Sequence, residues 1–251
     1  MTPLQIPAPP AGGFFIGPVE IRYYAICILV GIFIAAWLSR RRFVQRGGDA
    51  DRFDTIALIL VVVGIIGARL YHVITDYQLY FGPGRNPWQA FNIRSGGLGI
   101  WGGVMLGAFA AWLLARRYRF SFGELADVIA PGLLFAQSLG RLGNWFNQEL
   151  FGRPTDLPWA LYVEPRYRPT GYESYSTYHP TFLYEMVWTG LGGFVLLWVE
   201  RRFKLGRGKL FTCYVIWYTF GRFFIESLRI DPVNQVGGWR VNSYVSLILF
   251  A

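Results

Sequence analysis

The chain has 251 residues, of which 53% are apolar and only 16% are charged. A soluble globular domain carries about 25% charged residues, so this composition argues against a soluble protein. The net charge is +9, but the basic residues stand in short clusters between apolar runs. That arrangement is typical of the cytoplasmic loops of membrane proteins. It argues against nucleic-acid binding, which needs a basic patch on one face.

Cysteines and histidines are few, with two of each: Cys27, Cys213, His72 and His179. Both cysteines fall inside apolar runs, so we interpret them as small buried residues and not as a disulfide or a metal pair. Two histidines are too few for an ordinary metal site. We therefore expect neither a metal nor an organic cofactor.

Six apolar runs are candidates for crossing a bilayer, whose hydrocarbon core takes about 20 residues. They lie at about residues 21–38, 55–75, 98–115, 121–139, 179–199 and 210–228. Ser121 to Glu124 match a capping box, which places a helix start there. A last run, 244–251, is too short to cross. The sequence therefore predicts an all-α polytopic protein, one integral-membrane domain over 1–251 with seven transmembrane helices, the last of them truncated.

The distribution of lysine and arginine predicts the orientation. Thirteen of the 24 basic residues lie in the loops 40–52, 116–119 and 200–209. Eight lie in the opposite loops, 76–97, 141–178 and 229–242. The N-terminus is therefore expected outside, with 141–178 as a small extracytoplasmic segment.

With this orientation, unusual residues from five spans fall at one depth, near the outer leaflet. They are Tyr24, Arg69, Trp101, Arg141 and Arg222. Charged side chains at membrane depth are costly, and they usually mark a functional site.

Helical spacing groups several polar residues on shared faces. One face carries Tyr218, Arg222, Glu226 and Arg229, and another carries Arg69, His72 and Asp76. Arg141 and Asn144 share a face if their turn is helical. Glycines at 99, 103 and 107 have the four-residue spacing of a close helix-packing seam.

Each of these residues also has a structural interpretation. Arg222 and Glu226 can form an i,i+4 pair, Arg69 can extend to the interface, and tryptophans gather at membrane surfaces. Those interpretations explain poorly why three arginines would share one depth with few acidic residues nearby. Surplus positive charge should recruit an anion, and the planar guanidinium matches phosphate oxygens. In a membrane, the obvious phosphate is a lipid headgroup.

Residues 140–152 read Gly-Arg-Leu-Gly-Asn-Trp-Phe-Asn-Gln-Glu-Leu-Phe-Gly. This stretch resembles the signature of the bacterial phosphatidylglycerol–prolipoprotein diacylglyceryl transferases. Further stretches resemble the same family, in family order over about residues 16–249: 16–18 with 21–24, 95–98 with 102–103, His179 to Glu185, and Gly221 to Glu226 with Arg229.

The resemblance implies an enzyme of the bacterial plasma membrane, with seven helices and an active site toward the outer leaflet. Such an enzyme moves a diacylglyceryl group from phosphatidylglycerol to the lipobox cysteine thiol of a prolipoprotein. A thioether forms and glycerol-1-phosphate leaves. The expected partners are therefore phosphatidylglycerol, the prolipoprotein signal peptide and the lipid bilayer.

The resemblance also assigns residues. The essential arginines of the family fall on Arg141 and Arg222, and its essential tyrosine falls on Tyr24. The signature asparagine and the supporting or substrate-binding positions fall on Asn144, Arg69, Glu149, Gly152, Glu226 and Arg229. The arginines would stabilise the departing phosphate, and nearby cations would lower the pKa of the attacking thiol.

Trp101 departs from the family pattern, because many members have a histidine at that place. Tryptophan cannot accept a proton at physiological pH, so another group must act if a base is needed, and His72 is a possible substitute. Two further classes of function stay open at this point. A lipid or anion transporter could use the same arginines, and a structural scaffold would not depend on Arg141.

Overall fold

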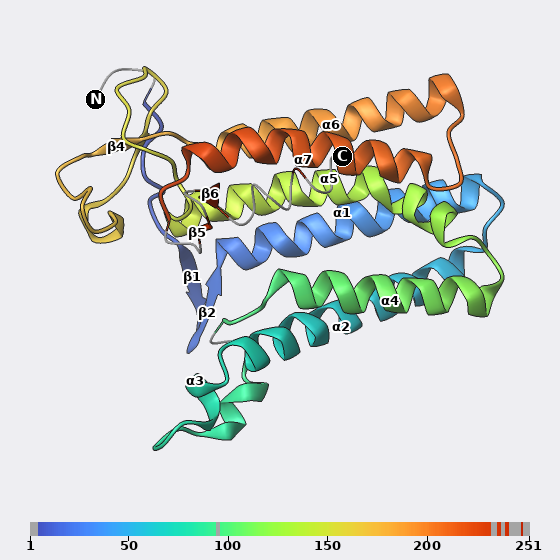
Figure 1. The fold of residues 1–251 in the computed structure, drawn as a ribbon, viewed down its shortest axis with the longest axis horizontal. Helices are drawn as coiled ribbons and strands as arrows, with labels where there is room; N and C mark the ends of the chain where they lie inside the picture. Colours follow the sequence, from blue (N-terminus) through green and yellow to red (C-terminus); the bar gives the residue numbers. More distant parts are fainter. Residues whose placement is uncertain (1–4, 94–95, 232–234, 237–238, 241–246, 248–251) are drawn as a thin grey trace. The chain divides into compact units, whose positions relative to one another are not determined.

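The computed structural model describes residues 5–93, 96–231, 235–236, 239–240 and 247. The chain is mostly helical, as its apolar runs predict (Figure 1). Its long helices are α1 (Tyr23–Gln45), α2 (Ala50–Thr75), α4 (Ile100–Tyr118), α5 (Phe122–Asn147), α6 (Thr181–Phe203) and α7 (Lys209–Leu228). Each of them contains most of one expected span.

Within the described part of the chain, three helices, α1, α2 and α6, are long and apolar enough to cross a membrane, by length and composition. Among the remaining long helices, α7 includes Arg222 and Glu226. The expected seventh span, 244–251, lies outside the described residues apart from Leu247. The total of seven spans and the placement of the N-terminus outside stay predictions.

Helix α5 continues to Asn147, well beyond the expected end of the fourth span near residue 139. The expected extramembrane segment 141–178 therefore begins inside a helix. The turn that carries Arg141 and Asn144 is therefore helical, and the two residues lie on one face, as predicted for that case. The helix can continue through this polar stretch because the side chains find partners, which are described below.

Short strands add to the helices, and the all-α prediction missed them. An N-terminal hairpin pairs β1 (Gly13–Ile16) with β2 (Val19–Arg22) through a turn at Gly17, whose φ is +59°. Arg22 thus belongs to a strand and not to the first span. The other pairs are β3 (Leu161–Tyr162) with β4 (Thr177–Tyr178) and β5 (Gln235–Val236) with β6 (Trp239–Arg240).

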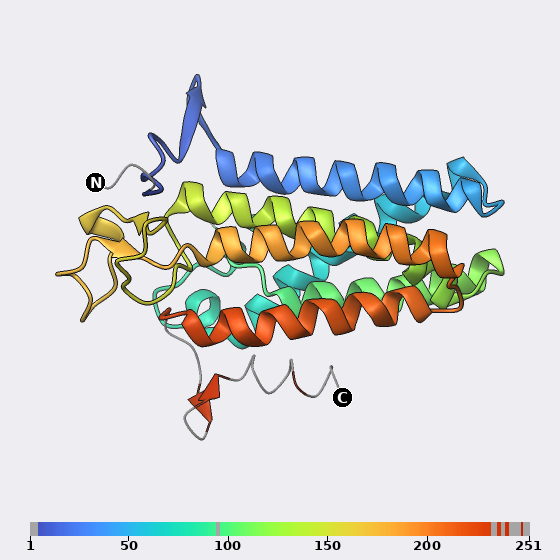
Figure 2. The same ribbon diagram turned by 90° about the horizontal axis from the view of Figure 1, so that it is seen from above.

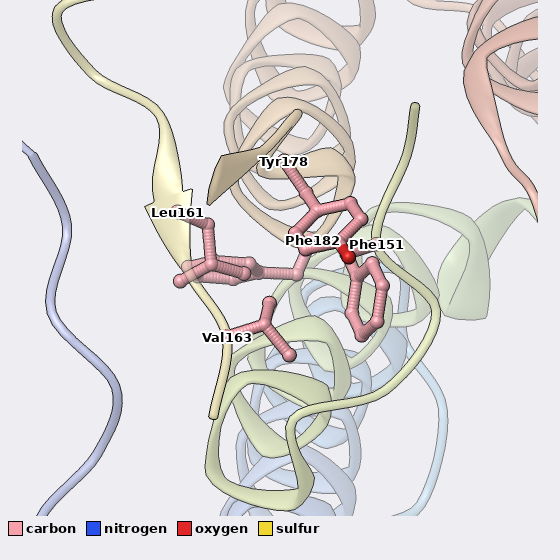
Figure 3. Packing of buried hydrophobic residues seen from close by; sticks show 5 residues of the cluster. All are labelled: Phe151, Leu161, Val163, Tyr178 and Phe182. Carbon is pink, nitrogen blue, oxygen red and sulfur yellow. The ribbon is translucent and has the colours of Figure 1, made fainter. Parts of the chain in front are cut away.

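The segment between α5 and α6 has its own small hydrophobic core. It also holds the short helix η3 (Pro165–Tyr167). Five side chains are buried together there (Figure 3): Phe151, Leu161, Val163, Tyr178 and Phe182. Because Phe182 lies in the first turn of α6, this core fixes the segment to the start of that helix.

Two compact units can be distinguished in the chain. The first comprises residues 1–39 and 126–251, and the second comprises residues 40–125. The expected single domain over the whole chain stays a prediction.

In the second unit, α2 packs closely on α4, and the short helices α3 (Gln78–Phe81) and η1 (Pro87–Phe91) contact each other. Gly67 and Gly102 allow the two backbones of α2 and α4 to meet, since a Cβ at either position would collide with the opposite backbone. Gly103 also faces α2, whereas Gly107 faces open space. The predicted glycine seam was therefore wrong at Gly107.

In the first unit, α5, α6 and α7 lie side by side with the first part of α1 (Figures 1 and 2). Reciprocal contacts of Trp188 and Trp217 join α6 to α7. The indole rings stack with centroids 4.4 Å apart, and each Nε1 donates to the backbone carbonyl of the other residue at 2.9 Å. Trp217 lies over Gly192 and Trp188 lies over Gly221, where a methyl group would collide with the ring. This tryptophan pair fixes the register of the two helices.

At the other end of α7, Asp127 of α5 caps the helix. Its carboxylate accepts hydrogen bonds from the backbone N–H groups of Gly208 (2.9 Å) and Phe211 (2.8 Å). A carboxylate is favourable at a helix N-terminus because it meets unpaired N–H donors and the positive end of the dipole. Asp127 thus positions α7 against α5.

We expect Gly192→Ala to lower the stability of the protein, because the new methyl group would overlap the Trp217 indole. Overpacking of this kind costs about 1–3 kcal/mol. Thermal unfolding of the detergent-purified protein measures the effect. Gly107→Ala is the matched control, a helical glycine beside open space, and it should unfold at or above the wild-type temperature. An unchanged Tm for Gly192→Ala would contradict the reciprocal packing.

Candidate functional site

A buried carboxylate, Glu185 of α6, joins two arginines from two other helices. Its Oε1 lies 2.7 Å from Nη2 of Arg141 on α5, and its Oε2 lies 2.9 Å from Nη1 of Arg222 on α7. The glutamate is only 3% exposed. An ion pair removed from water in this way persists only with close geometry and further hydrogen bonds.

A second buried carboxylate, Glu226, continues the network along α7. Its Oε2 lies 2.5 Å from Nη2 of Arg222 and 3.7 Å from Nη1 of Arg229. Arg229 in turn donates from Nε and Nη2 to the two oxygens of Asp231, at 2.7 and 2.9 Å. We call Arg141, Arg222 and Arg229 the arginine cluster. Each of its members already has at least one carboxylate partner.

The last turn of α5 holds Arg141 from its other side. Arg141 Nη1 donates to Oδ1 of Asn144 at 3.1 Å, and Asn144 Nδ2 donates to Oε1 of Glu149 at 2.9 Å. Asn147 donates to the same glutamate oxygen at 3.0 Å. Asn144 and Glu149 therefore orient Arg141 and shape the end of the helix.

Tyr24, in the first turn of α1, packs against Gly143 of α5. A side chain at position 143 would collide with the tyrosine ring, with Cδ2 only 2.6 Å from the added Cβ. Gly143 lies two residues after Arg141 on the same helix. The structure thus brings Tyr24 beside the turn of α5 that carries Arg141.

Gly152 lies where three backbone segments meet. Its N–H donates to the carbonyl of His179 at 2.9 Å, and it forms an isolated β-bridge with Arg229. A Cβ at this position would lie 2.8 Å from Cβ of His179 and 3.0 Å from the carbonyl oxygen of Leu228. The glycine therefore allows the chain to pass beside Arg229.

His179 contributes to the same region through its backbone and its ring. The pKa of His179 lies below the ordinary value for histidine, first because the ring is partly buried and second because Arg153 is positively charged. Its Nδ1 lies 3.2 Å from the hydroxyl of Tyr184. A neutral ring suits this hydrogen bond and does not suit the binding of an anion.

A narrow crevice, with no room for a water molecule, lies at the arginine cluster; we call it the pocket. Its lining residues come from α5, from α6 and from the segments that follow α5 and α7: Arg141, Asn144, Leu150, Thr181, Phe182, Glu185 and Arg229. Guanidinium groups and an amide thus face one small space, together with the Glu185 carboxylate.

In the second unit, Arg69 is only 7% exposed, and its guanidinium donates to backbone carbonyls. Nε and Nη2 donate to Ala90 and Gln89, at 2.7 and 2.6 Å, and Nη1 donates to Gly96 and Gly97, at 2.7 and 2.9 Å. Arg69 therefore holds the segment that precedes α4.

His72 and Trp101 also belong to the second unit. Nδ1 of His72 lies 3.0 Å from Oδ2 of Asp76, and the ring lies against Gly97, whose φ is +78°. Any side chain at Gly97 would collide with the imidazole. Trp101 lies in the first turn of α4 and is 41% exposed.

The prediction of surplus positive charge is wrong for the arginine cluster, because carboxylates pair with its members. The sequence places Glu226 on one helical face with Arg222, but it predicts no role for Glu185 or Asp231. A signal for Glu185 was present, because it is a lone acidic residue early in an otherwise apolar span, and such a residue marks a site by default.

Comparison with known proteins points to the same family as the sequence motifs. The sequence model of prolipoprotein diacylglyceryl transferases matches residues 12–251. This chain belongs to that family. A phosphatidylglycerol–prolipoprotein diacylglyceryl transferase of Cutibacterium acnes is 54% identical, over all of this chain and 84% of the relative. Transferases of the same name from Corynebacterium efficiens and Streptomyces avermitilis are each 48% identical, over 81% and 71% of their lengths and 100% and 98% of this chain.

We expect Gly152→Ala to destabilise this member of the transferase family. The added methyl group would press on the Leu228 carbonyl and on His179, at a cost of about 1–3 kcal/mol. Thermal unfolding in detergent measures the loss. Gly12→Ala serves as control, because its Cβ would meet nothing closer than 3.6 Å. Equal unfolding temperatures for the two variants would contradict the tight passage at Gly152.

Proposed function

We propose that this chain transfers a diacylglyceryl group from phosphatidylglycerol to the lipobox cysteine of a prolipoprotein, the first step of lipoprotein maturation. Membership of the family and the names of relatives over nearly the whole chain support this activity. At the level of residues, one observation carries the proposal: Arg141 and Arg222 meet on a shared carboxylate beside a pocket.

The reaction is a displacement at an sp3 carbon of the lipid glycerol. The thiol sulfur forms a bond to that carbon, the carbon–oxygen bond to phosphate breaks, and glycerol-1-phosphate leaves with the electron pair. Negative charge grows on the phosphate as this bond breaks. Arg141 and Arg222 can stabilise that charge through several N–H donors held in place before the reaction.

The neighbouring residues support this arginine pair. Asn144 and Glu149 orient Arg141, and Glu226 orients Arg222 and Arg229. We propose that Arg229, which lines the pocket, also contacts the lipid headgroup. Tyr24 lies beside Arg141, and its hydroxyl is a candidate donor to the headgroup or to the thiol.

Gly152 and Arg69 would act through the backbone. Gly152 places the chain beside Arg229, and Arg69 fixes the glycine-rich segment before Trp101. We propose that Trp101 binds substrate through its apolar ring, since it cannot exchange a proton there.

We propose that the enzyme spans the bacterial plasma membrane and that its site opens toward the outer leaflet. The apolar helices and the positive-inside distribution support this placement. In this arrangement the anionic headgroup would meet the arginine cluster, while the acyl chains stay in the bilayer.

Arg141→Ala and Arg222→Ala should each lower the transfer rate about a hundredfold or more, because each removes a preorganised donor to the leaving phosphate. The lysine variants should recover only part of the rate, since lysine lacks the planar fork. The assay supplies phosphatidylglycerol and a lipobox peptide to the purified protein. Arg166→Ala is the control, because this side chain is 71% exposed. A near wild-type rate for folded Arg141→Ala would refute the phosphate role.

The thiol must also lose a proton. Carboxylates balance the charge of the arginine cluster, so surplus positive charge no longer explains how the thiol ionises. We propose His72 as the proton acceptor in place of the family histidine missing at Trp101. Asp76 holds its Nδ1, the way a carboxylate orients a catalytic imidazole. Among the described residues of the second unit, Tyr80 lies against its ring, and Arg69 approaches the same glycine, Gly97.

His72→Gln should lower the transfer rate about a hundredfold, the lower end for loss of a general base. It should also flatten the dependence of rate on pH. Adding Trp101→His to this variant tests whether an imidazole at that position restores the rate. An unchanged pH profile in His72→Gln excludes His72 as the base.

A further inference from the structure

The shared carboxylate at the centre of the site has a geometry that a phosphate could reproduce. Each oxygen of Glu185 lies on a different guanidinium, at 2.7 Å from Arg141 and 2.9 Å from Arg222. A phosphodiester also presents two charged oxygens from one central atom, and arginine binds both kinds of anion in the same way. Glu185 therefore occupies the position that an incoming phosphate needs.

The balance of charges between arginines and carboxylates also indicates that a phosphate would replace Glu185. Three cations, Arg141, Arg222 and Arg229, face three carboxylates, Glu185, Glu226 and Asp231. Because every arginine of the cluster has an acidic partner, none of them offers a phosphate an uncompensated positive charge. A phosphate bound beside these carboxylates would be repelled by their negative charge, so the exchange of one carboxylate for the phosphate is favoured.

Among these carboxylates, Glu185 is the one that lines the pocket. Glu226 is fully buried, with 0% exposure, and Asp231 holds Arg229 through both of its oxygens. Glu185 thus meets a ligand first. The tryptophan pair begins three residues after it on α6, which keeps its backbone in register with α7 during any exchange.

We infer that Glu185 is a resident counter-ion that the phosphate of the lipid displaces from Arg141 and Arg222, and that returns to them when the product leaves. The inference rests on the proposed function. In the absence of ligand, Glu185 gives these two arginines, which are 22% and 10% exposed, a shared counter-charge.

The return of Glu185 to the arginines would promote release of the product. The product is a phosphate monoester, with a charge of about −1.5 to −2 at neutral pH, whereas the phosphodiester substrate carries a single charge. The arginines would therefore hold the product more tightly than the substrate. A carboxylate that competes for the same N–H donors weakens this binding and promotes release.

Glu185→Gln separates this role from a purely structural one. The amide keeps the size of the side chain and removes its charge, so glycerol-1-phosphate should bind the full-length protein about tenfold more tightly or better. Titration calorimetry in detergent gives the Kd, and inhibition of transfer by glycerol-1-phosphate gives the matching constant. A purely structural role predicts the opposite sign, because disordered arginines would bind the product less well.

Two further variants complete the test. Glu185→Asp keeps the charge, but its shorter side chain cannot reach both guanidinium groups, so the affinity should rise by a smaller factor. If Glu185→Gln does not fold, the affinity of Glu185→Asp for glycerol-1-phosphate tests the inference in its place. Glu164→Gln removes a carboxylate that lies outside the pocket and pairs with Arg166, and it should leave the affinity unchanged.

The outcomes are distinct. Unchanged or weaker product binding in folded Glu185→Gln, or in Glu185→Asp if the first variant does not fold, overturns the inference. An equal gain in Glu164→Gln also overturns it, because the effect would then be one of overall charge. Failure of the wild-type protein to transfer the lipid group refutes the proposed function instead, and the binding measurement needs no thiol acceptor.

Discussion

The site depends on one constraint, which is that two arginines largely removed from water cannot lie together without a counter-charge. Glu185 satisfies this constraint from a third helix, and Glu226 adds a second carboxylate on the same helix as Arg222. Removing one partner of such a buried pair typically costs about 3–5 kcal/mol. The helices that carry these residues must therefore keep a fixed register, or the charges would separate.

The remainder of the first unit maintains that register. The stacked indoles of Trp188 and Trp217 hold α6 against α7, and glycines opposite each ring make room for them. Asp127 positions the start of α7 from α5. At the other end, the buried cluster around Tyr178 ties the segment after α5 to the first turn of α6. Packing and capping thus place Arg141 and Arg222 within hydrogen-bonding distance of Glu185.

Much of this arrangement was predictable from the sequence. Long apolar runs predict the long helices well, because burial in a membrane leaves an unambiguous pattern. Residues at helical spacing, such as Arg222 and Glu226, were grouped correctly. The polar continuation of α5 was missed, because its side chains find partners that no spacing rule predicts, such as Glu149 after the helix and Glu185 on α6. The hairpin at Gly17 was missed for a similar reason, since a short exposed strand pair leaves little periodic signal. Glu185 was overlooked because its partners are 44 and 37 positions away along the chain, and no spacing rule reveals such a contact.

An experimental structure with glycerol-1-phosphate bound tests the central claim most directly. The account predicts that phosphate oxygens lie about 2.7–3.0 Å from guanidinium nitrogens of both Arg141 and Arg222, with the Glu185 carboxylate moved away from them. A phosphate bound elsewhere, with both Glu185 ion pairs intact, would contradict it.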